Sequence, residues 1–236
     1  MSRAGEFVQD LGKALMMPIS VIAAAGIFLG LAAALQNPAI VGEGMIHAQA
    51  MQQAIGFIRK VAGALFGNLP LLFAIAAAVG LARDEKPTAA LAAVIGFITL
   101  HVGVNFSLTA QGLTPETTSA SAFMAKGYSQ TEAVMYAAEF ANTLGIFSYQ
   151  MSVLGGVIAG IVTVLLHNRF YTIQLPAAIA YFGGRRFVPI ITVIVLPLVG
   201  LGLSFIWPVI AGGIIRLGEF IGHAGAAGTF FYALTE

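Results

Sequence analysis

Five long apolar stretches dominate the sequence and decide what it can fold into. They cover residues 14–35, 61–82, 88–110, 144–166 and 187–215. A helix that crosses a hydrocarbon core about 30 Å thick needs about 20 mostly apolar residues, and each stretch meets that length. The last stretch is the longest, and its prolines predict kinks. We therefore expect an all-α, polytopic membrane protein with about five transmembrane helices plus interfacial helices.

The composition excludes several other classes of protein. Charged residues make up 9% of the chain, whereas soluble domains carry about 25%, so a soluble globular domain is excluded. The net charge of +1 provides no basic surface, and we expect no nucleic-acid partner. The absence of cysteine excludes disulfides and a cysteine phospho-acceptor on this chain. The histidines lack metal-ligand spacing and no nucleotide-binding or nucleophile motif occurs, so we expect no catalytic residue, metal or cofactor.

Lys and Arg residues set the expected orientation, because they favour the cytoplasmic side of a membrane. With five spans, seven lie on the side of the N-terminus and four on the other: Arg3, Lys13, Arg83, Lys86, Arg169, Arg185 and Arg186 against Arg59, Lys60, Lys126 and Arg216. This distribution predicts a cytoplasmic N-terminus.

The two ends of the chain are expected to contact the membrane surface. Phe7, Val8, Leu11 and Leu15 share one helical face, which predicts an interfacial helix before the first span rather than a signal peptide. Residues 217–236 are expected either to open a sixth membrane element or to lie at the interface.

Two loops carry recognisable signals. Residues 83–87 (RDEKP) form a tight polar turn, so we expect the second and third spans to form an antiparallel hairpin. In the long loop 111–143, Ser129 and Glu132 have the spacing of a capping box. The apolar residues after it predict a short helix reaching Ala141 and ending before Gly145, on the membrane surface or against a partner subunit.

Polar residues inside a span are candidate binding residues, because their burial in lipid is costly. His101 and Asn105 are four residues apart and share one helical face. They are weak candidates for contact with a hydrophilic substrate, and an interhelical hydrogen-bond pair is the favoured interpretation. Glycine pairs such as Gly156/Gly160 fit close helix packing but do not establish a dimer.

Residues 167–186 carry three basic residues: Arg169, Arg185 and Arg186. The two adjacent arginines follow Gly183-Gly184 directly before a span. The favoured interpretation is a positive anchor at the cytoplasmic side, with a flexible turn before the span. The alternative is a cationic surface that meets an anionic partner or a phosphorylated group.

Several stretches together resemble one family. Residues 168–170 (NRF), 175–176 (LP) and 182–189 (FGGRRFVP) resemble the membrane component, enzyme IIC, of the bacterial sugar phosphotransferase system, in its glucose/maltose/N-acetylglucosamine branch. Four further stretches agree in family order: 11–18 (LGKALMMP), 68–74 (NLPLLFA), 80–84 (GLARD) and 206–208 (IWP). Ala177 departs from the pattern, since many members have Asp there. Residues 30–38 and 41–43 are most similar to α-glucoside/maltose-type members.

The resemblance implies an architecture and partners. Residues 1–216 would form the N-terminal scaffold and dimerisation half of enzyme IIC, and residues 217–236 would start the connection to a sugar-binding half. The Gly-Leu-His-His and Thr-Glu-Pro stretches of the family's sugar site do not occur in the sequence. Implied partners are a sugar, a phosphorylated IIB domain or subunit, the lipid bilayer and a second copy in a homodimer. The implied location is the bacterial cytoplasmic (inner) membrane.

The resemblance implies a permease that translocates glucose, maltose or a related α-glucoside and couples this to phosphorylation by IIB. The main alternative is a truncated, non-transporting membrane scaffold or dimerisation module, since the sugar-site stretches are missing. An unrelated small channel or transporter would explain the composition but not the order of the motifs.

Overall fold

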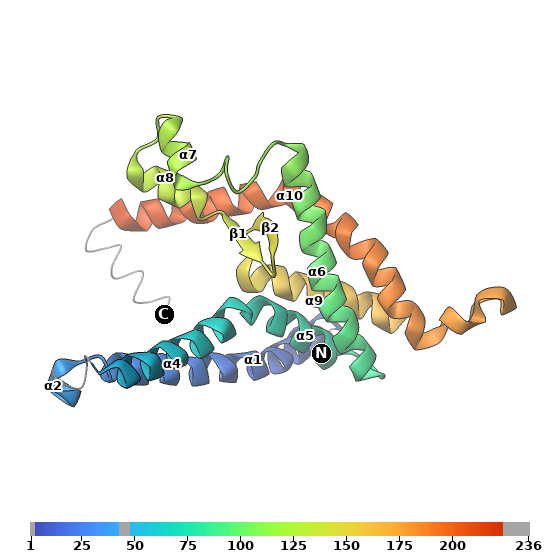
Figure 1. Ribbon diagram of the computed structural model, residues 1–236. Helices are drawn as coiled ribbons and strands as arrows, with labels where there is room; N and C mark the ends of the chain where they lie inside the picture. The colour runs from blue at the N-terminus through green and yellow to red at the C-terminus, as the bar shows by residue number, and fades with distance from the viewer. Residues whose placement is uncertain (1–2, 43–47, 224–236) are drawn as a thin grey trace. The chain divides into compact units, whose positions relative to one another are not determined.

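A computed structural model describes residues 3–42 and 48–223 of the chain. The regular structure of the described residues is helical apart from one two-stranded hairpin (Figure 1). The chain divides into two compact units. Unit 1 comprises Met1–Phe97 with Ser152–Ile194, and unit 2 comprises Ile98–Met151 with Val195–Glu236. The division falls inside two helices, α6 (Lys86–Ala110) and α10 (Phe187–His223), each of which contributes to both units.

Unit 1 is built on a long N-terminal helix and on the helices that pack against it and against one another. Its elements are α1 (Arg3–Ala34), α2 (Pro38–Val41), α4 (Gln49–Gly67), α5 (Leu69–Leu81), α9 (Ser152–Phe170), η1 (Ala177–Phe182), η2 (Gly184–Arg186) and the adjoining parts of α6 and α10. The interfacial helix expected before the first span is continuous with that span, because α1 runs unbroken from Arg3 to Ala34. Its apolar part, Gly5–Ala34, is long enough to cross a membrane.

The second predicted span is a broken helix rather than a continuous one. Helix α4 begins at Gln49, well before the predicted start, and α5 leaves it at an angle of 49°. The break follows from Pro70, which has no backbone N–H and lies in the first turn of α5. Asn68 closes the end of α4, because its Nδ2 donates to the carbonyl of Ala64 at 2.8 Å. Counting this bent pair as one span, the described residues contain up to five spans, which confirms the expected number.

Close backbone contact holds α5 against α9. A Cβ added to Gly156 would clash with the backbone of Pro70, and one added to Gly160 would clash with Ala74 and Ala77. This glycine pair therefore packs as predicted. The tight turn at 83–87 is also confirmed. The helices on its two sides were expected to pack as an antiparallel hairpin, but α5 packs mainly against α9 and α1. Helix α6 joins them near the turn, in an alanine-rich core cluster.

Unit 2 contains the only strands of the described residues. Its elements are α7 (Ala120–Ala125), α8 (Gln130–Ala137), β1 (Phe140–Thr143), β2 (Ile146–Tyr149) and the adjoining parts of α6 and α10. The predicted capping box is confirmed: the Ser129 backbone N–H donates to Glu132 at 2.9 Å. The predicted helix is too long, however, because α8 ends at Ala137 and Ala141 lies in β1.

The predicted start of the fourth span at residue 144 is wrong. Residues 146–149 pair with β1 as an antiparallel strand, and α9 begins only at Ser152. Leu144 and Gly145 form the two-residue turn between the strands, with φ of 52° and 85°. Positive φ at both turn residues is the geometry that matches the twist of a two-residue hairpin.

Within unit 2, α6 and α10 cross at small residues. A Cβ on Gly103 would clash with Pro197, and one on Gly200 would clash with Leu100. The hydroxyl of Ser204 donates to that of Ser107 at 2.7 Å in the same seam. The fifth predicted span is confirmed by the candidate span Gly184–Gly213, and helix α10, with Pro197 and Pro208 inside it, continues to His223. The element expected over residues 217–236 thus begins as part of α10, and residues 224–236 lie outside the described residues.

Candidate functional site

The turn between α5 and α6 is held by the last turn of α9. The Asn168 side chain reaches two backbone groups of this turn: its Nδ2 donates to the carbonyl of Leu81, and its Oδ1 accepts from the N–H of Arg83, both at 3.0 Å. The carbonyls at the end of a helix have no partner inside the helix. Asn168 therefore caps the end of α5 from a neighbouring helix and fixes where the polar turn begins.

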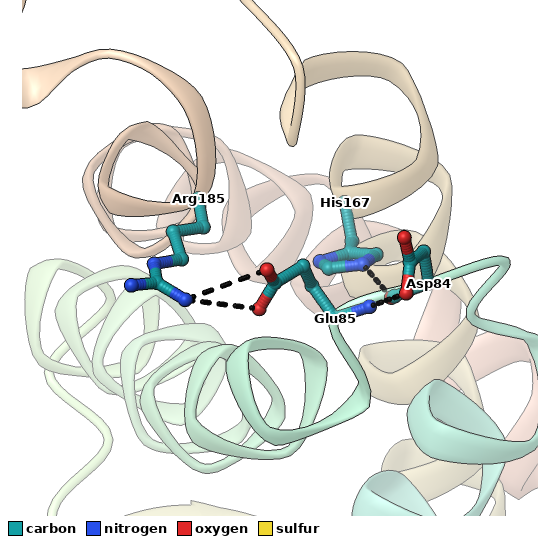
Figure 2. Close-up of polar contacts among 4 residues, drawn as sticks. All are labelled: Asp84, Glu85, His167 and Arg185. Atoms are coloured by element: carbon teal, nitrogen blue, oxygen red, sulfur yellow. Dashed lines mark hydrogen bonds and ion pairs between the residues drawn. The ribbon is translucent and has the colours of Figure 1, made fainter.

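His167 adds a second contact to the same turn. Its Nε2 lies 2.8 Å from the backbone carbonyl of Asp84 (Figure 2). A carbonyl can only accept, so Nε2 carries the hydrogen in this contact. The ring is fully buried and stacks on Tyr171 with 5.3 Å between ring centroids. Nδ1 of His167 and Oγ1 of Thr163, one helical turn earlier, are buried without a hydrogen-bond partner among the described residues.

Arg185 reaches this turn from the segment before α10. Its Nη1 lies 3.4 Å from the Glu85 carboxylate, and both side chains are partly exposed (Figure 2). Gly184, directly before it, has φ of 61°, and its N–H donates to the carbonyl of Ile173 at 2.7 Å. Glycine tolerates this conformation without the strain of a side chain. The predicted Gly183-Gly184 turn therefore has a defined geometry that presents the following arginines.

The other two predicted basic residues are also exposed. Arg186 lies over the ring of Tyr181, 4.2 Å from its centroid, and donates to the Tyr181 carbonyl at 3.2 Å. Arg169 lines an open pocket of about 940 Å³ with Arg83, Glu6 and Asp10. The pocket has two cationic and two anionic side chains, so its charge does not select an anion by itself. We define the basic surface as Arg169, Arg185 and Arg186.

His101 and Asn105 hold the hairpin of unit 2. Nδ1 of His101 lies 2.7 Å from the Ser148 hydroxyl, and Nδ2 of Asn105 donates to the Phe147 carbonyl at 2.7 Å. Both partners are in β2, so the pair forms hydrogen bonds as the favoured interpretation predicts, but to a strand instead of another helix. The pair belongs to unit 2 and the basic surface to unit 1.

Several titratable groups near the hairpin and the start of α8 in unit 2 have shifted pKa values. Burial raises the pKa of Glu139, directly before β1. Burial, and then the nearby charge of Glu139, raises the pKa of Tyr149 in β2. At the start of α8 the direction is opposite, because hydrogen bonds from the Ser129 side chain and backbone lower the pKa of Glu132. These shifts are local to the hairpin and the capping box.

Comparison with known proteins decides the family. The sequence model of the family described as "Phosphotransferase system, EIIC" matches residues 12–236. The chain belongs to this family. The predicted resemblance is thereby confirmed over most of the sequence, and the chain is a multi-pass protein of the bacterial inner membrane.

Three curated relatives show the same membership. The "PTS system maltose-specific EIICB component" of Escherichia coli (strain K12) is 39% identical over 98% of the chain and 41% of the relative. Two proteins of Staphylococcus carnosus (strain TM300) are similar. The "PTS system glucose-specific EIICBA component" is 35% identical over 90% of the chain and 29% of the relative. The "PTS system glucoside-specific EIICBA component" is 36% identical over 97% of the chain and 32% of the relative. The EIIC chain thus spans well under half the length of these relatives.

Sequence reasoning about this EIIC chain missed the role of His167 and Asn168. Both lie at the start of the segment compared with the family, yet they were not singled out as contacts of the turn at 81–85. The available signal was an apolar helix whose last turn carries two adjacent side chains that can form hydrogen bonds, His167 and Asn168. Such residues cap either their own helix or a neighbouring one, and only the fold shows which.

Proposed function

We propose that the chain forms the N-terminal scaffold half of an EIIC permease, in residues 1–216, and that residues 217–236 lead to its sugar-binding half. The permease translocates glucose, maltose or a related α-glucoside and is coupled to phosphorylation of the sugar by IIB. The names of the relatives, which are specific for maltose, glucose and glucosides, support this range of substrates. The chain acts as a homodimer with its N-terminus in the cytoplasm.

The observation that carries this proposal is the anchored basic surface of unit 1. Arg185 forms an ion pair with Glu85. The turn that carries Glu85 is held by hydrogen bonds from His167 and Asn168. Arg186 is held on Tyr181. Guanidinium groups bind phosphoryl oxygens through two parallel hydrogen bonds, which suits a phosphorylated partner. The basic surface therefore receives the phosphorylated IIB domain or subunit on the cytoplasmic side.

The test uses the full-length permease in cells that lack other uptake routes for these sugars. Sugar phosphorylation dependent on phosphoenolpyruvate is measured for Arg185→Gln with Arg186→Gln, and for the matched pair Arg59→Gln with Lys60→Gln on α4. We expect the first pair to lower the phosphorylation rate strongly with unchanged sugar binding, while the α4 pair has little effect. Glu85→Gln breaks the ion pair but keeps both arginines, so it separates the anchoring of Arg185 from the charge itself.

Several outcomes would contradict the proposal. Equal losses for the two pairs of variants would show that the basic surface has no special role. Uptake independent of phosphoenolpyruvate would indicate a different transporter. A protein that dimerises but supports no uptake would favour the non-transporting scaffold.

We propose a structural role for His101 and Asn105, namely to position the hairpin, because both side chains already bond to β2. His101→Ala is therefore expected to destabilise the hairpin. Loss of sugar binding with a hairpin of unchanged stability would instead assign the pair to the sugar.

A further inference from the structure

An apolar groove runs along unit 1 between α1 and α5. It has a volume of about 370 Å³, and its walls come from α1 and α5, for example from Met17, Val21, Leu72 and Ile75. The remaining lining consists of small or apolar residues and two lysines. Helix α1 carries exposed apolar side chains around the groove, such as Met17 at 78% exposure, and such a surface suits contact with hydrocarbon. The groove has the chemistry of a site for an acyl chain.

The charged end of the groove lies where α1 and α5 are in close contact. Gly80 has no side chain, and a Cβ there would clash with Ala14 of α1. Lys13 lies next to this contact on α1, and Lys86 lies just beyond α5 at the start of α6. From Gly80 the groove continues along α5 to Leu72, a rise of about 12 Å at 1.5 Å per residue. The groove is thus apolar along its length and cationic at one end.

The charge at this end favours an anion. No carboxylate is found among the described residues that line the groove. Lys13 lies 3.4 Å from Asp10, but both side chains are more than half exposed, so this pair contributes little. Next to Lys86, the Glu85 carboxylate is engaged by Arg185, while the exposed Asp84 side chain accepts from the Glu85 N–H. Lys13 and Lys86 also belong to the side that carries more basic residues, where anionic headgroups attract cations.

We propose that this groove binds an anionic phospholipid, with one acyl chain between α1 and α5 and the phosphate between Lys13 and Lys86. Both parts of such a lipid find a matching surface: the chain meets apolar side chains, and the phosphate meets two ammonium groups. A zwitterionic lipid gains the same apolar contact but loses much of the electrostatic attraction, because its own cation opposes the lysines. The site therefore selects lipids by the charge of the headgroup.

The experiment measures lipid retention by the whole chain in detergent with native mass spectrometry. Phosphatidylglycerol and phosphatidylcholine with identical acyl chains are the probes. We expect the wild type to prefer phosphatidylglycerol, and Lys13→Gln with Lys86→Gln to lower its affinity by about 10- to 30-fold, from two lysines near an anionic group. The control Arg59→Gln with Lys60→Gln removes two cations from α4 and is expected to keep the preference.

A second variant tests the apolar part of the site. Ala76 lines the groove, so Ala76→Phe is expected to weaken binding of both lipids without changing their ratio. Soluble glycerol phosphate is expected not to compete. The proposal is overturned if the lysine variant keeps its preference for phosphatidylglycerol, if the α4 control loses as much, or if glycerol phosphate displaces the lipid.

Discussion

Replacing Asn168 by alanine tests whether one side chain holds the turn between α5 and α6. The variant loses two hydrogen bonds of 3.0 Å, to the Leu81 carbonyl and from the Arg83 N–H. A neutral hydrogen bond contributes about 1 kcal/mol net, and the exposed bond to Arg83 contributes toward the low end of the range. We therefore expect N168A to lower the free energy of unfolding by about 1.5–2 kcal/mol. For a chain of this size that corresponds to a melting temperature lower by roughly 4–7 °C.

The assay is thermal unfolding of the purified chain in detergent, followed by the fraction that remains monodisperse after heating. Asn168→Leu keeps the approximate volume but neither hydrogen bond, so it is expected to be destabilised like N168A. Asn142→Ala, at an exposed position in β1, is the matched control and is expected to change little. A loss below about 0.5 kcal/mol for N168A, within the range of ordinary surface substitutions, would refute this account. So would full stability of the leucine variant.

Three further predictions concern local geometry. Gly156→Ala is expected to lower the free energy of unfolding by about 1–3 kcal/mol through overpacking, because a Cβ there would lie 2.7 Å from the Pro70 carbonyl carbon. Gly63→Ala has open space around the new methyl group and is expected to raise the free energy of unfolding by about 0.5–1 kcal/mol. Comparison of the two melting temperatures checks this. Leu144→Asn is expected to stabilise the hairpin by about 1 kcal/mol, because asparagine tolerates positive φ, and slower hydrogen exchange of β1 and β2 would show it. Since the pKa of Glu132 is lowered in the fold, its contribution to α8 is complete above its ordinary pKa and is lost as the pH falls through the lowered value. Hydrogen exchange of α8 against pH should show this loss, and Ser129→Ala should weaken it.

The parts of the fold that sequence predicted well have only one physical interpretation. Residues 88–110 and 187–215 are uncharged and too long for a strand, so a membrane helix is the only structure that satisfies their backbone. The capping box is equally direct, because its spacing brings Ser129 and Glu132 together within one turn. These elements needed no information from elsewhere in the chain.

Residues 144–151 show where the same reasoning failed. A short apolar run is compatible with both a buried strand and the start of a helix. The deciding feature is the turn at Leu144-Gly145, and leucine is not a residue that signals positive φ. The strand is also held by His101 and Asn105, more than 40 positions earlier in the sequence. Local patterns carry no record of such a contact.

The candidate site likewise has a part that the sequence could predict and a part that it could not. The basic surface could be located from the sequence, because arginines next to a span are exposed at a membrane interface. Its anchoring could not, since the contact between Arg185 and Glu85 joins residues 100 positions apart. Asn168 and His167 reach across 83 to 87 positions to the turn at Leu81–Asp84. Hydropathy marks only where a helix ends, whereas these side chains determine what its end touches.

Helix α9 supplies the physical link between the core of unit 1 and its basic surface. Its middle lies on the backbone of α5 at Gly156 and Gly160, and its last turn holds the end of α5 through Asn168. The segment that follows α9 has little regular structure of its own, and η1 contains a non-helical residue at Ile179. Arg185 is positioned both by the Gly184 turn and by its ion pair with Glu85, which lies on a turn that α9 fixes. It follows that the packing of α5 on α9 supports the position of Arg185 in the basic surface, although none of the residues in that seam is exposed there.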